Sequence, residues 1–268
     1  MTRVDILVKK GSEELLGLDF YGLSGGVWVE DEAEGVRIRC YPPDPARFLA
    51  FLRASPLPTL HVAAVEEREQ DYVALVRRHF TPVNVAGVTI LPPWRTPRAK
   101  GLTIFIEPGM AFGTGRHEST RLMIRMMGRT TLGAKRVLDL GAGSGILSVY
   151  AALLAASLVV AVDHDPLAVE AARKARDLNA TPEVLLACAD IEAVCGVFDV
   201  VLANLDFATF EKHADRVSRL VAPGGSLLLS GIEAQYNRGL PPLFRGLEIV
   251  GRHRMGDWRA FMFRAPAI

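Results

Sequence analysis

Cysteine is scarce in this chain of 268 residues, which has three cysteines and no C-x-x-C pair. Disulfide-stapled secreted domains and zinc ribbons need more cysteines at closer spacing. We therefore expect Cys40, Cys188 and Cys195 to be reduced, buried thiols. The six histidines show no metal-ligand spacing either, so the sequence predicts no metal site.

An excess of one charge is also missing, because 31 Lys and Arg residues stand against 30 Asp and Glu residues. Domains that bind nucleic acid usually carry a basic excess, so we expect no direct nucleic-acid binding. The amino terminus is charged and alternating, unlike a signal peptide. We expect a cytoplasmic monomer with no membrane partner.

One stretch without a charged residue, 146–162, is close to the length of a membrane span. A glycine turn precedes it and Asp163 ends it. Its first part is rich in alanine and leucine and its second part in valine. We therefore interpret it as a buried helix followed by a buried strand.

The most informative stretch is 137–147, where a short apolar run ends in Asp139 and a glycine-rich turn follows. Gly141, Gly143 and Gly145 allow a tight turn and a close approach of the backbone to a ligand. A helix that begins near Ser144 would point free N–H groups at that ligand. The turn therefore predicts a nucleotide-type cofactor site, in which Asp163 accepts hydrogen bonds from the ribose hydroxyls.

The spacing of the glycines favours one cofactor. A dinucleotide fingerprint reads G-x-G-x-x-G, and its last glycine would fall on Ile146. Asp139 would also repel a pyrophosphate, whereas a carboxylate suits a ligand with a free amino group. These features favour S-adenosylmethionine, with an NAD site and a purely structural turn as the alternatives.

Two parts of the chain differ in pattern. Residues 1–66 show a βαββαβ order, which predicts a small ferredoxin-like domain. Residues 67–100 predict a connecting helix and a proline-rich linker, with a strand at 85–91. The acidic cluster at 66–71 is either a solvated face or a contact for a cationic protein substrate.

Residues 101–268 alternate strands and helices, which is typical of a doubly wound α/β domain with a parallel sheet. Ligands bind such sheets at the carboxyl ends of the strands. Asp139, Asp163, Asp190 and Asn204 all follow predicted strands, so we expect them to converge on one crevice. A last helix and a hairpin around Trp258 complete the pattern.

A loop with three glycines and an aromatic residue at 107–120 can fold over a flat ligand. No G-K-[ST] follows at the spacing of a P-loop. A plain surface loop is the alternative, but it leaves Phe112 among glycines unexplained. His117, taken alone, is more often structural than catalytic.

These motifs resemble class I S-adenosylmethionine methyltransferases, and more narrowly the bacterial ribosomal protein L-eleven methyltransferase family (PrmA). The matching stretches are Leu91-Pro-Pro-Trp-Arg95, Glu107-Pro-Gly-Met-Ala-Phe-Gly-Thr-Gly-Arg-His117 with Thr120, Gly141-Ala-Gly-Ser-Gly-Ile146, Val162-Asp-His-Asp-Pro166, Ala203-Asn204-Leu205 and Ser230-Gly231-Ile232. The resemblance implies a Rossmann-like methyltransferase domain over residues 101–268 and a substrate-recognition domain over residues 1–66. It also implies methylation of lysine ε-amino groups and an N-terminal α-amino group on a ribosomal protein.

We assign hypothetical roles to the site residues on this basis. Asn204 is the candidate catalytic residue, because its carbonyl oxygen can orient the lone pair of the target amine. The proposed cofactor-binding set is Phe112, Thr114, Gly115, His117, Asp139, Gly141, Gly143, Gly145, Asp163, Asp190 and Asn204, with Asp163 on the ribose, Asp190 on the adenine amino group, and Asp139 and the glycines on the methionine portion. Phe112, Thr114 and His117 would form a lid.

Three positions depart from the family pattern. Tyr72 and Val76 replace tryptophans that are common in the connecting helix, and Asp206 replaces an apolar residue. Asp206 either pairs with a cationic amine or caps the next helix, and we favour the cap. These departures leave open a different protein substrate or a small-molecule amine. A nucleic-acid methyltransferase, a non-catalytic cofactor sensor and a dehydrogenase are less favoured.

Overall fold

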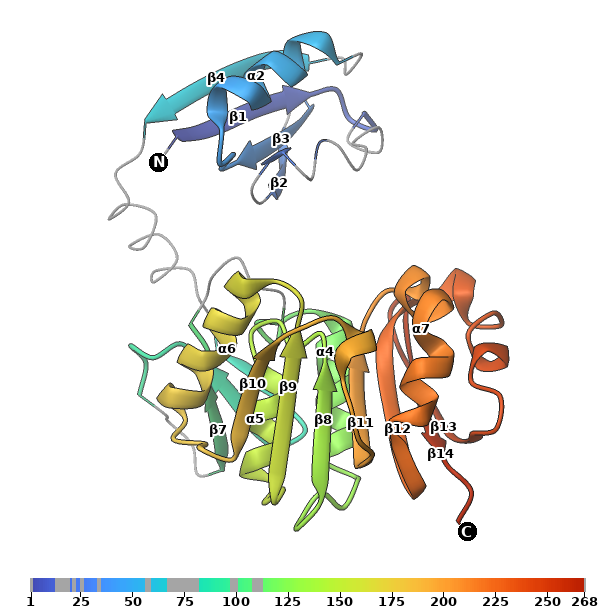
Figure 1. Ribbon diagram of the computed structural model, residues 1–268. Coiled ribbons are helices and arrows are strands. Elements are labelled where there is room, and N and C mark those ends of the chain that lie inside the picture. Colours follow the sequence, from blue (N-terminus) through green and yellow to red (C-terminus); the bar gives the residue numbers. More distant parts are fainter. Residues whose placement is uncertain are drawn as a thin grey trace. The chain divides into compact units, whose positions relative to one another are not determined.

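The computed structural model describes residues 2–12, 20, 23–24, 27–32, 35–55, 59–66, 82–96, 101–107 and 113–267. The chain divides into two compact units, residues 1–80 and 81–268 (Figure 1). The connecting helix expected after residue 66, with Tyr72 and Val76, lies outside the described residues, as does Phe112.

The first unit is a four-stranded antiparallel sheet in the order β2-β3-β1-β4 (Figure 1). Its elements are β1 (Thr2–Val8), β2 (Val27–Glu32), β3 (Gly35–Cys40), α2 (Pro45–Ala54) and β4 (Thr59–Glu66). Phe20 and Leu23, between β1 and β2, are also helical. This order and these directions are those of a ferredoxin-like domain. Alternate residues of β1 and β3 are buried with Phe48 of α2.

Helix α2 begins with an aspartate cap and a proline. The Asp44 carboxylate accepts a hydrogen bond from the backbone N–H of Arg47 at 3.0 Å, and Pro45 is the first helical residue. An aspartate cap followed by proline satisfies one free N–H and removes another.

The second unit opens with a small three-stranded sheet of β5 (Val83–Val85), β6 (Val88–Leu91) and β7 (Leu102–Phe105). The prediction of one strand over 85–91 is wrong, because Ala86 and Gly87 have φ angles of 50° and 81°. Two consecutive positive φ angles form a tight hairpin turn between β5 and β6. These strands belong to the same compact unit as the residues after 101.

The main sheet has seven strands in the order β10-β9-β8-β11-β12-β14-β13. All neighbours are parallel except β14, which is antiparallel to β12 and β13. The strands are β8 (Arg136–Leu140), β9 (Leu158–Asp163), β10 (Val184–Cys188), β11 (Phe198–Asn204), β12 (Val221–Glu233), β13 (Glu248–Met255) and β14 (Trp258–Arg264). The predicted doubly wound sheet and its terminal hairpin are confirmed.

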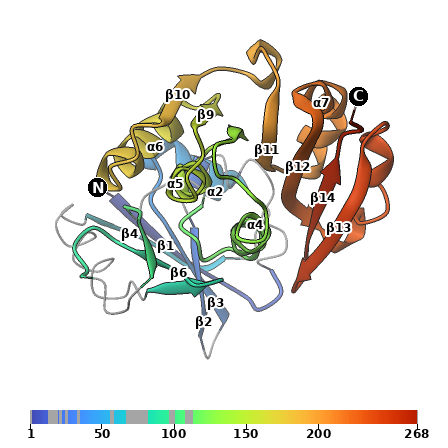
Figure 2. The same cartoon turned by 90° about the horizontal axis from the view of Figure 1, so that it is seen from below.

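Helices cover both faces of this sheet. Helices α4 (Glu118–Met127), α5 (Ile146–Leu153) and α6 (Pro166–Leu178) pack on one face, and α7 (Phe207–Arg219) packs on the other (Figure 2). Alternate residues of one strand enter different cores, as Val137 and Leu138 of β8 do. Because both faces of the sheet are covered, alternating residues of a central strand such as β8 are buried on either side.

The stretch at 146–162 forms α5 and most of β9, as predicted. Among the described residues, no helix has the length and apolar character needed to cross a membrane. The expected last helix is wrong, because the chain after β12 forms only short 3-10 turns, Ala234–Tyr236 and Pro241–Leu243. Consecutive prolines at 241 and 242 deprive a helix of two N–H donors.

The prediction that all three cysteines are buried is also wrong. Cys40 lies in the first core, where burial raises the pKa of its thiol to about 12. Cys188 and Cys195 are exposed. Cys188 is the last residue of β10, a strand at one end of the sheet order, where a side chain has fewer neighbours.

Candidate active site

Four polar side chains lie at the carboxyl edge of the main sheet, as the strand pattern predicts. Asp139 is the penultimate residue of β8, while Asp163 and Asn204 end β9 and β11. Asp190 follows β10 by two residues. The parallel register pairs Leu140 with Val162 and with Ala203, so these strand ends are level with one another.

The glycine turn after β8 is fastened to the end of β9. The backbone N–H groups of Gly141 and Ala142 donate to the Val162 carbonyl at 2.9 and 3.1 Å. The N–H of Gly143 donates to Oδ2 of Asp163 at 2.9 Å. Gly145 has a φ of 77°, and a Cβ there would lie 2.9 Å from Cα of Ala172 in α6. A larger residue would therefore push α5 and α6 apart.

Asp163 is 8% exposed and held by two backbone donors. Besides Gly143, the N–H of Asp165 donates to Oδ1 of Asp163 at 3.0 Å. Each carboxylate oxygen accepts more than one hydrogen bond, so both oxygens keep capacity for hydroxyl donors. The carboxylate is fixed before any ligand arrives.

Asp139 is 1% exposed, and its two oxygens have different surroundings. The Ser148 hydroxyl of α5 donates to Oδ2 at 2.5 Å, whereas Oδ1 is buried without a hydrogen-bond partner among the described residues. Burial raises the pKa of Asp139 to about 7, against the lowering effect of the Ser148 bonds. A buried, unpaired acceptor at this position fits a cationic or N–H-bearing ligand group.

Asn204 shows the same feature on the next strand. Its Nδ2 donates to Oγ1 of Thr120 in α4 at 3.4 Å. Its Oδ1 is buried and has no partner within the described part of the chain. Thr120 belongs to the motif at 107–120, but no spacing rule predicts its contact with a residue 84 positions away.

The loop before α4 lies against the glycine turn. The Ser144 hydroxyl donates to the Gly113 carbonyl at 2.7 Å. A Cβ on Gly115 would lie 2.3 Å from Cδ1 of Ile90 and 3.3 Å from Cδ1 of Ile146. The structure therefore brings the two glycine-rich segments together, and Thr114 lies between these anchored glycines. The part played by Phe112 remains a prediction.

His117 is the N-cap of α4. Its Nδ1 accepts from the Ser119 N–H at 3.3 Å and lies 2.7 Å from the Ser119 hydroxyl. Its ring packs edge-on against Trp258, with centroids 4.4 Å apart. Burial lowers the pKa of His117, and Glu118 opposes that effect. His117 thus fixes the start of the helix that carries Thr120.

Asp190 and Asp206 each cap a helical turn. Oδ1 of Asp190 accepts from the Glu192 N–H at 2.9 Å, and this bond lowers the pKa of Asp190. Oδ1 of Asp206 accepts from the Thr209 N–H at 2.7 Å at the start of α7. The preferred interpretation of Asp206 as a helix cap is confirmed.

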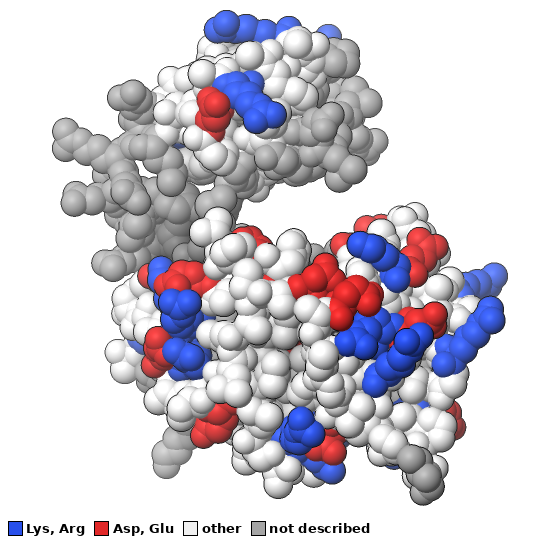
Figure 3. Space-filling view, viewed as in Figure 1, with Lys and Arg blue, Asp and Glu red and all other residues white. Residues whose placement is uncertain are grey.

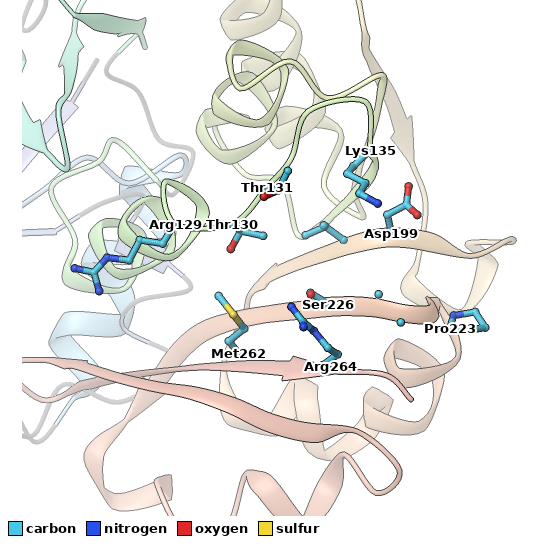
Figure 4. Close-up of a pocket in the computed structure, with 12 residues that line it drawn as sticks. Arg129, Thr130, Thr131, Lys135, Asp199, Pro223, Ser226, Met262 and Arg264 are labelled. Atoms are coloured by element: carbon cyan, nitrogen blue, oxygen red, sulfur yellow. The ribbon is translucent and has the colours of Figure 1, made fainter. Parts of the chain in front are cut away.

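A separate cavity of about 390 Å³ lies at the opposite, amino edge of the sheet (Figure 4). Lys135 and Asp199 lie side by side on one wall, and Ser226 and Arg264 lie side by side on the opposite wall. None of the predicted site residues lines it.

On the face of the second unit seen in Figure 3, acidic and basic side chains are mixed. Among the described residues, no His, Cys, Asp and Glu cluster could hold a metal ion.

Comparison with known proteins identifies the family. Residues 31–266 match the family described as ribosomal protein L11 methyltransferase (PrmA). This chain belongs to the ribosomal protein L11 methyltransferase family. It is 34% identical over 257 residues to the enzyme of that name from Citrifermentans bemidjiense, a match that covers 91% of this chain and 82% of the relative. It is 32% identical over 255 residues to the one from Bacillus cereus strain Q1, covering 88% and 82% of the two chains.

A solved structure supports the same family assignment. The crystal structure of a ribosomal protein L11 methylase from Lactobacillus delbrueckii subsp. bulgaricus is similar with a TM-score of 0.65 and 25% identity. The match covers 70% of this chain and all of the other chain.

The cap at His117 predicts a pH dependence of stability. Because its folded pKa is lowered, the unfolded state binds more protons below the ordinary histidine pKa of about 6.5. Its stabilising contribution is therefore present above that pH and lost as the pH falls. Between pH 7.5 and 5.5, the free energy of unfolding measured in urea should fall more for the wild type than for His117→Asn, which keeps a cap acceptor that does not titrate. An equal fall in the two proteins would contradict this role.

Proposed function

We propose that this protein methylates lysine ε-amino groups and the N-terminal α-amino group of ribosomal protein L11, with S-adenosylmethionine as the methyl donor. The observation that carries the proposal is a pair of buried oxygens, Asp139 Oδ1 and Asn204 Oδ1, on the adjacent strands β8 and β11. Neither oxygen has a hydrogen-bond partner among the residues that the structure describes. Each oxygen can accept a hydrogen bond from a ligand. The cofactor ammonium would donate to Asp139 and the target amine would donate to Asn204.

The residues at this edge fit the proposed cofactor. Asp163, already oriented by Gly143 and Asp165, would accept the ribose hydroxyls. Asp190 would face the adenine amino group. Asp139 and the positive-φ glycines would hold the methionine portion, since a carboxylate suits an ammonium and the bare backbone allows close approach. Thr114, Gly115 and His117, with Phe112, would cover the ligand.

When bound, S-adenosylmethionine supplies a methyl group on a positively charged sulfur: the amine nitrogen bonds to the methyl carbon while the carbon–sulfur bond breaks and its electron pair stays on sulfur. Charge disperses in this step, so the protein's task is positioning rather than strong acid catalysis. Holding two reactants in line can lower a barrier by roughly 7–11 kcal/mol.

The target amine must be neutral to attack. A lysine in water has a pKa of about 10.4 and is almost entirely protonated at neutral pH. Desolvation at the site lowers that pKa because it disfavours the charged form. Asn204 Oδ1 would then accept an N–H of the neutral amine and leave its lone pair free to face the methyl group. An amide is suited to this role because it cannot form an ion pair that would hold the amine protonated.

Mass spectrometry of intact L11 from the same organism tests the proposal. Incubation with this protein and S-adenosylmethionine should add mass in methyl steps, and Asn204→Ala should abolish the gain because the amine loses its acceptor. Fragmentation of the product should place the methyl groups on lysine side chains and the terminal amine. No gain in mass with wild-type protein that still binds the cofactor would overturn L11 as substrate and favour another amine.

The raised pKa of Asp139 predicts that cofactor affinity depends on pH. An ammonium binds the ionised carboxylate, so affinity should increase from pH 5.5 to about 7, the pKa of Asp139. The same ionisation costs folding stability as the pH rises through that value. Calorimetry should show this rise in cofactor affinity for the wild type over pH 5.5–7.5. The range stays below the pKa of a free α-amino group, roughly 7.7–8.0, so that the cofactor ammonium remains mostly protonated.

The matched variant is Asp139→Asn, which keeps the shape and an acceptor but does not titrate. Its affinity should be weaker at pH 7.5 and nearly constant over the same range. An identical pH dependence in the two proteins would show that another group controls cofactor binding.

A further inference from the structure

The cavity at the amino edge of the main sheet lies apart from the proposed active site. Its walls come from the turn after α4, the residue before β8, the first residues of β11 and β12, and the end of β14. Strand β11 carries Asp199 at this edge and Asn204 at the other. The volume of about 390 Å³ falls within the range of small-molecule pockets, roughly 300–1,000 Å³. The cavity can therefore hold a small organic molecule rather than a single ion.

The lining of this cavity carries more positive than negative charge. Its cationic side chains are Arg129, Lys135 and Arg264, and its one carboxylate is Asp199, which gives a net charge of +2. None of the three cations forms an ion pair with another described residue. Lys135 and Arg264 lie on opposite walls, and Arg129 extends away from both (Figure 4). A concave site lined by one sign of charge attracts ions of the opposite sign, so this cavity favours an anion.

Hydroxyl groups accompany the cations. Ser226 is 7% exposed, and its hydroxyl has no hydrogen bond to another described residue. Thr131 supplies a second hydroxyl to the lining. Ser226 and Arg264 are opposite each other in the antiparallel ladder of β12 and β14, so their side chains lie on the same face of the sheet. A ligand in the cavity can thus meet a guanidinium and a hydroxyl on one wall.

Backbone contacts hold these walls in place. The Arg136 N–H donates to Oδ2 of Asp199 at 2.8 Å, which fixes a carboxylate that can still accept further hydrogen bonds. A Cβ on Gly225 would lie 2.9 Å from the Asp199 carbonyl oxygen, so the turn before Ser226 packs directly on β11. The Ala265 N–H donates to the Gly225 carbonyl at 2.9 Å and ties the same turn to the end of β14. Such fixed walls lower the ordering cost of binding.

We propose that this cavity binds a small phosphate monoester that carries hydroxyl groups, the class to which sugar phosphates belong. A phosphate monoester has a charge of about −1.5 to −2 at pH 7, which matches the net charge of the lining. Its oxygens would accept hydrogen bonds from Lys135 and Arg264 on opposite walls and from the hydroxyls of Ser226 and Thr131. Asp199 repels a phosphate but would accept a hydrogen bond from a hydroxyl of the organic part.

Calorimetry of the full chain with ribose 5-phosphate and with inorganic phosphate, in a buffer without phosphate, tests this site. The wild type should bind ribose 5-phosphate roughly 3- to 10-fold more tightly, the scale of one added hydrogen bond. Arg264→Gln and Lys135→Gln should each weaken that binding about tenfold or more, the scale of a charge-assisted hydrogen bond. No binding by the wild type, or equal binding of the two probes, would overturn the proposal.

The matched control is Arg245→Gln, which removes the same charge from an exposed arginine that does not line the cavity. Its affinity for ribose 5-phosphate should stay within about twofold of the wild type, because salt screens distant surface charges. A loss in Arg245→Gln as large as that in Arg264→Gln would mean that overall charge, not the cavity, controls binding.

The cofactor site must be distinguished from this cavity, because it is also proposed to hold a ribose. Saturation with S-adenosylmethionine, or the variant Asp163→Asn, should leave the affinity for ribose 5-phosphate within about twofold of the wild type. Competition between the two ligands would place the probe at the carboxyl edge and overturn the proposal. Failure of the wild type to methylate L11 would instead overturn the proposed function and leave this site intact.

A short single-stranded RNA tests the other source of phosphate. It should bind no more tightly than ribose 5-phosphate, because the cavity is sized for one phosphate ester and not for a chain of phosphodiesters. Tighter binding of the RNA that is lost in both Arg264→Gln and Lys135→Gln would assign these cations to a polyanion surface and overturn the proposal.

Discussion

The level ends of four parallel strands are the constraint on which the site depends. In the order β10-β9-β8-β11, each strand delivers one polar residue to the same edge, and the backbone ladder fixes their heights. The bond from the Gly143 N–H to Asp163 then ties the glycine turn of one strand to the acid of the next. A shift in register between β8 and β9 would break this bond and separate the two groups proposed to share one cofactor.

Two side chains at this edge are under-satisfied within the described part of the protein. Ser148 satisfies one oxygen of Asp139 and Thr120 satisfies the nitrogen of Asn204, which leaves one buried oxygen on each residue. Folding does not require a buried oxygen without a partner at either position, since an apolar residue would avoid the cost of burying an unpaired acceptor. In a well-packed sheet end, neighbouring residues satisfy all buried polar atoms. At this edge two buried oxygens lack a hydrogen-bond donor among the described residues, as expected of a ligand-binding site. Asp206 and Asp190, by contrast, hold local turns.

The sequence predicted most of this arrangement because strand ends and glycine turns are local patterns. The positions of Asp139, Asp163 and Asn204 follow from apolar runs that stop at polar residues. The Thr120–Asn204 contact was not predictable, because it joins residues 84 positions apart and depends on how α4 packs. The hairpin at Ala86–Gly87 was not predicted because alanine seldom adopts a positive φ. The prediction of a last helix was wrong because it did not take account of the two prolines at 241 and 242.

The central claim is that the carboxyl edge binds the cofactor, and calorimetry with S-adenosylmethionine tests it most directly. Asp163→Asn removes a charge and one acceptor at that edge, whereas Asp199→Asn makes the same change beside the cavity at the amino edge. We predict that Asp163→Asn weakens binding by about tenfold or more, the scale of a charge-assisted hydrogen bond, while Asp199→Asn binds like the wild type. Unchanged affinity in Asp163→Asn, or a loss in Asp199→Asn alone, would contradict the account.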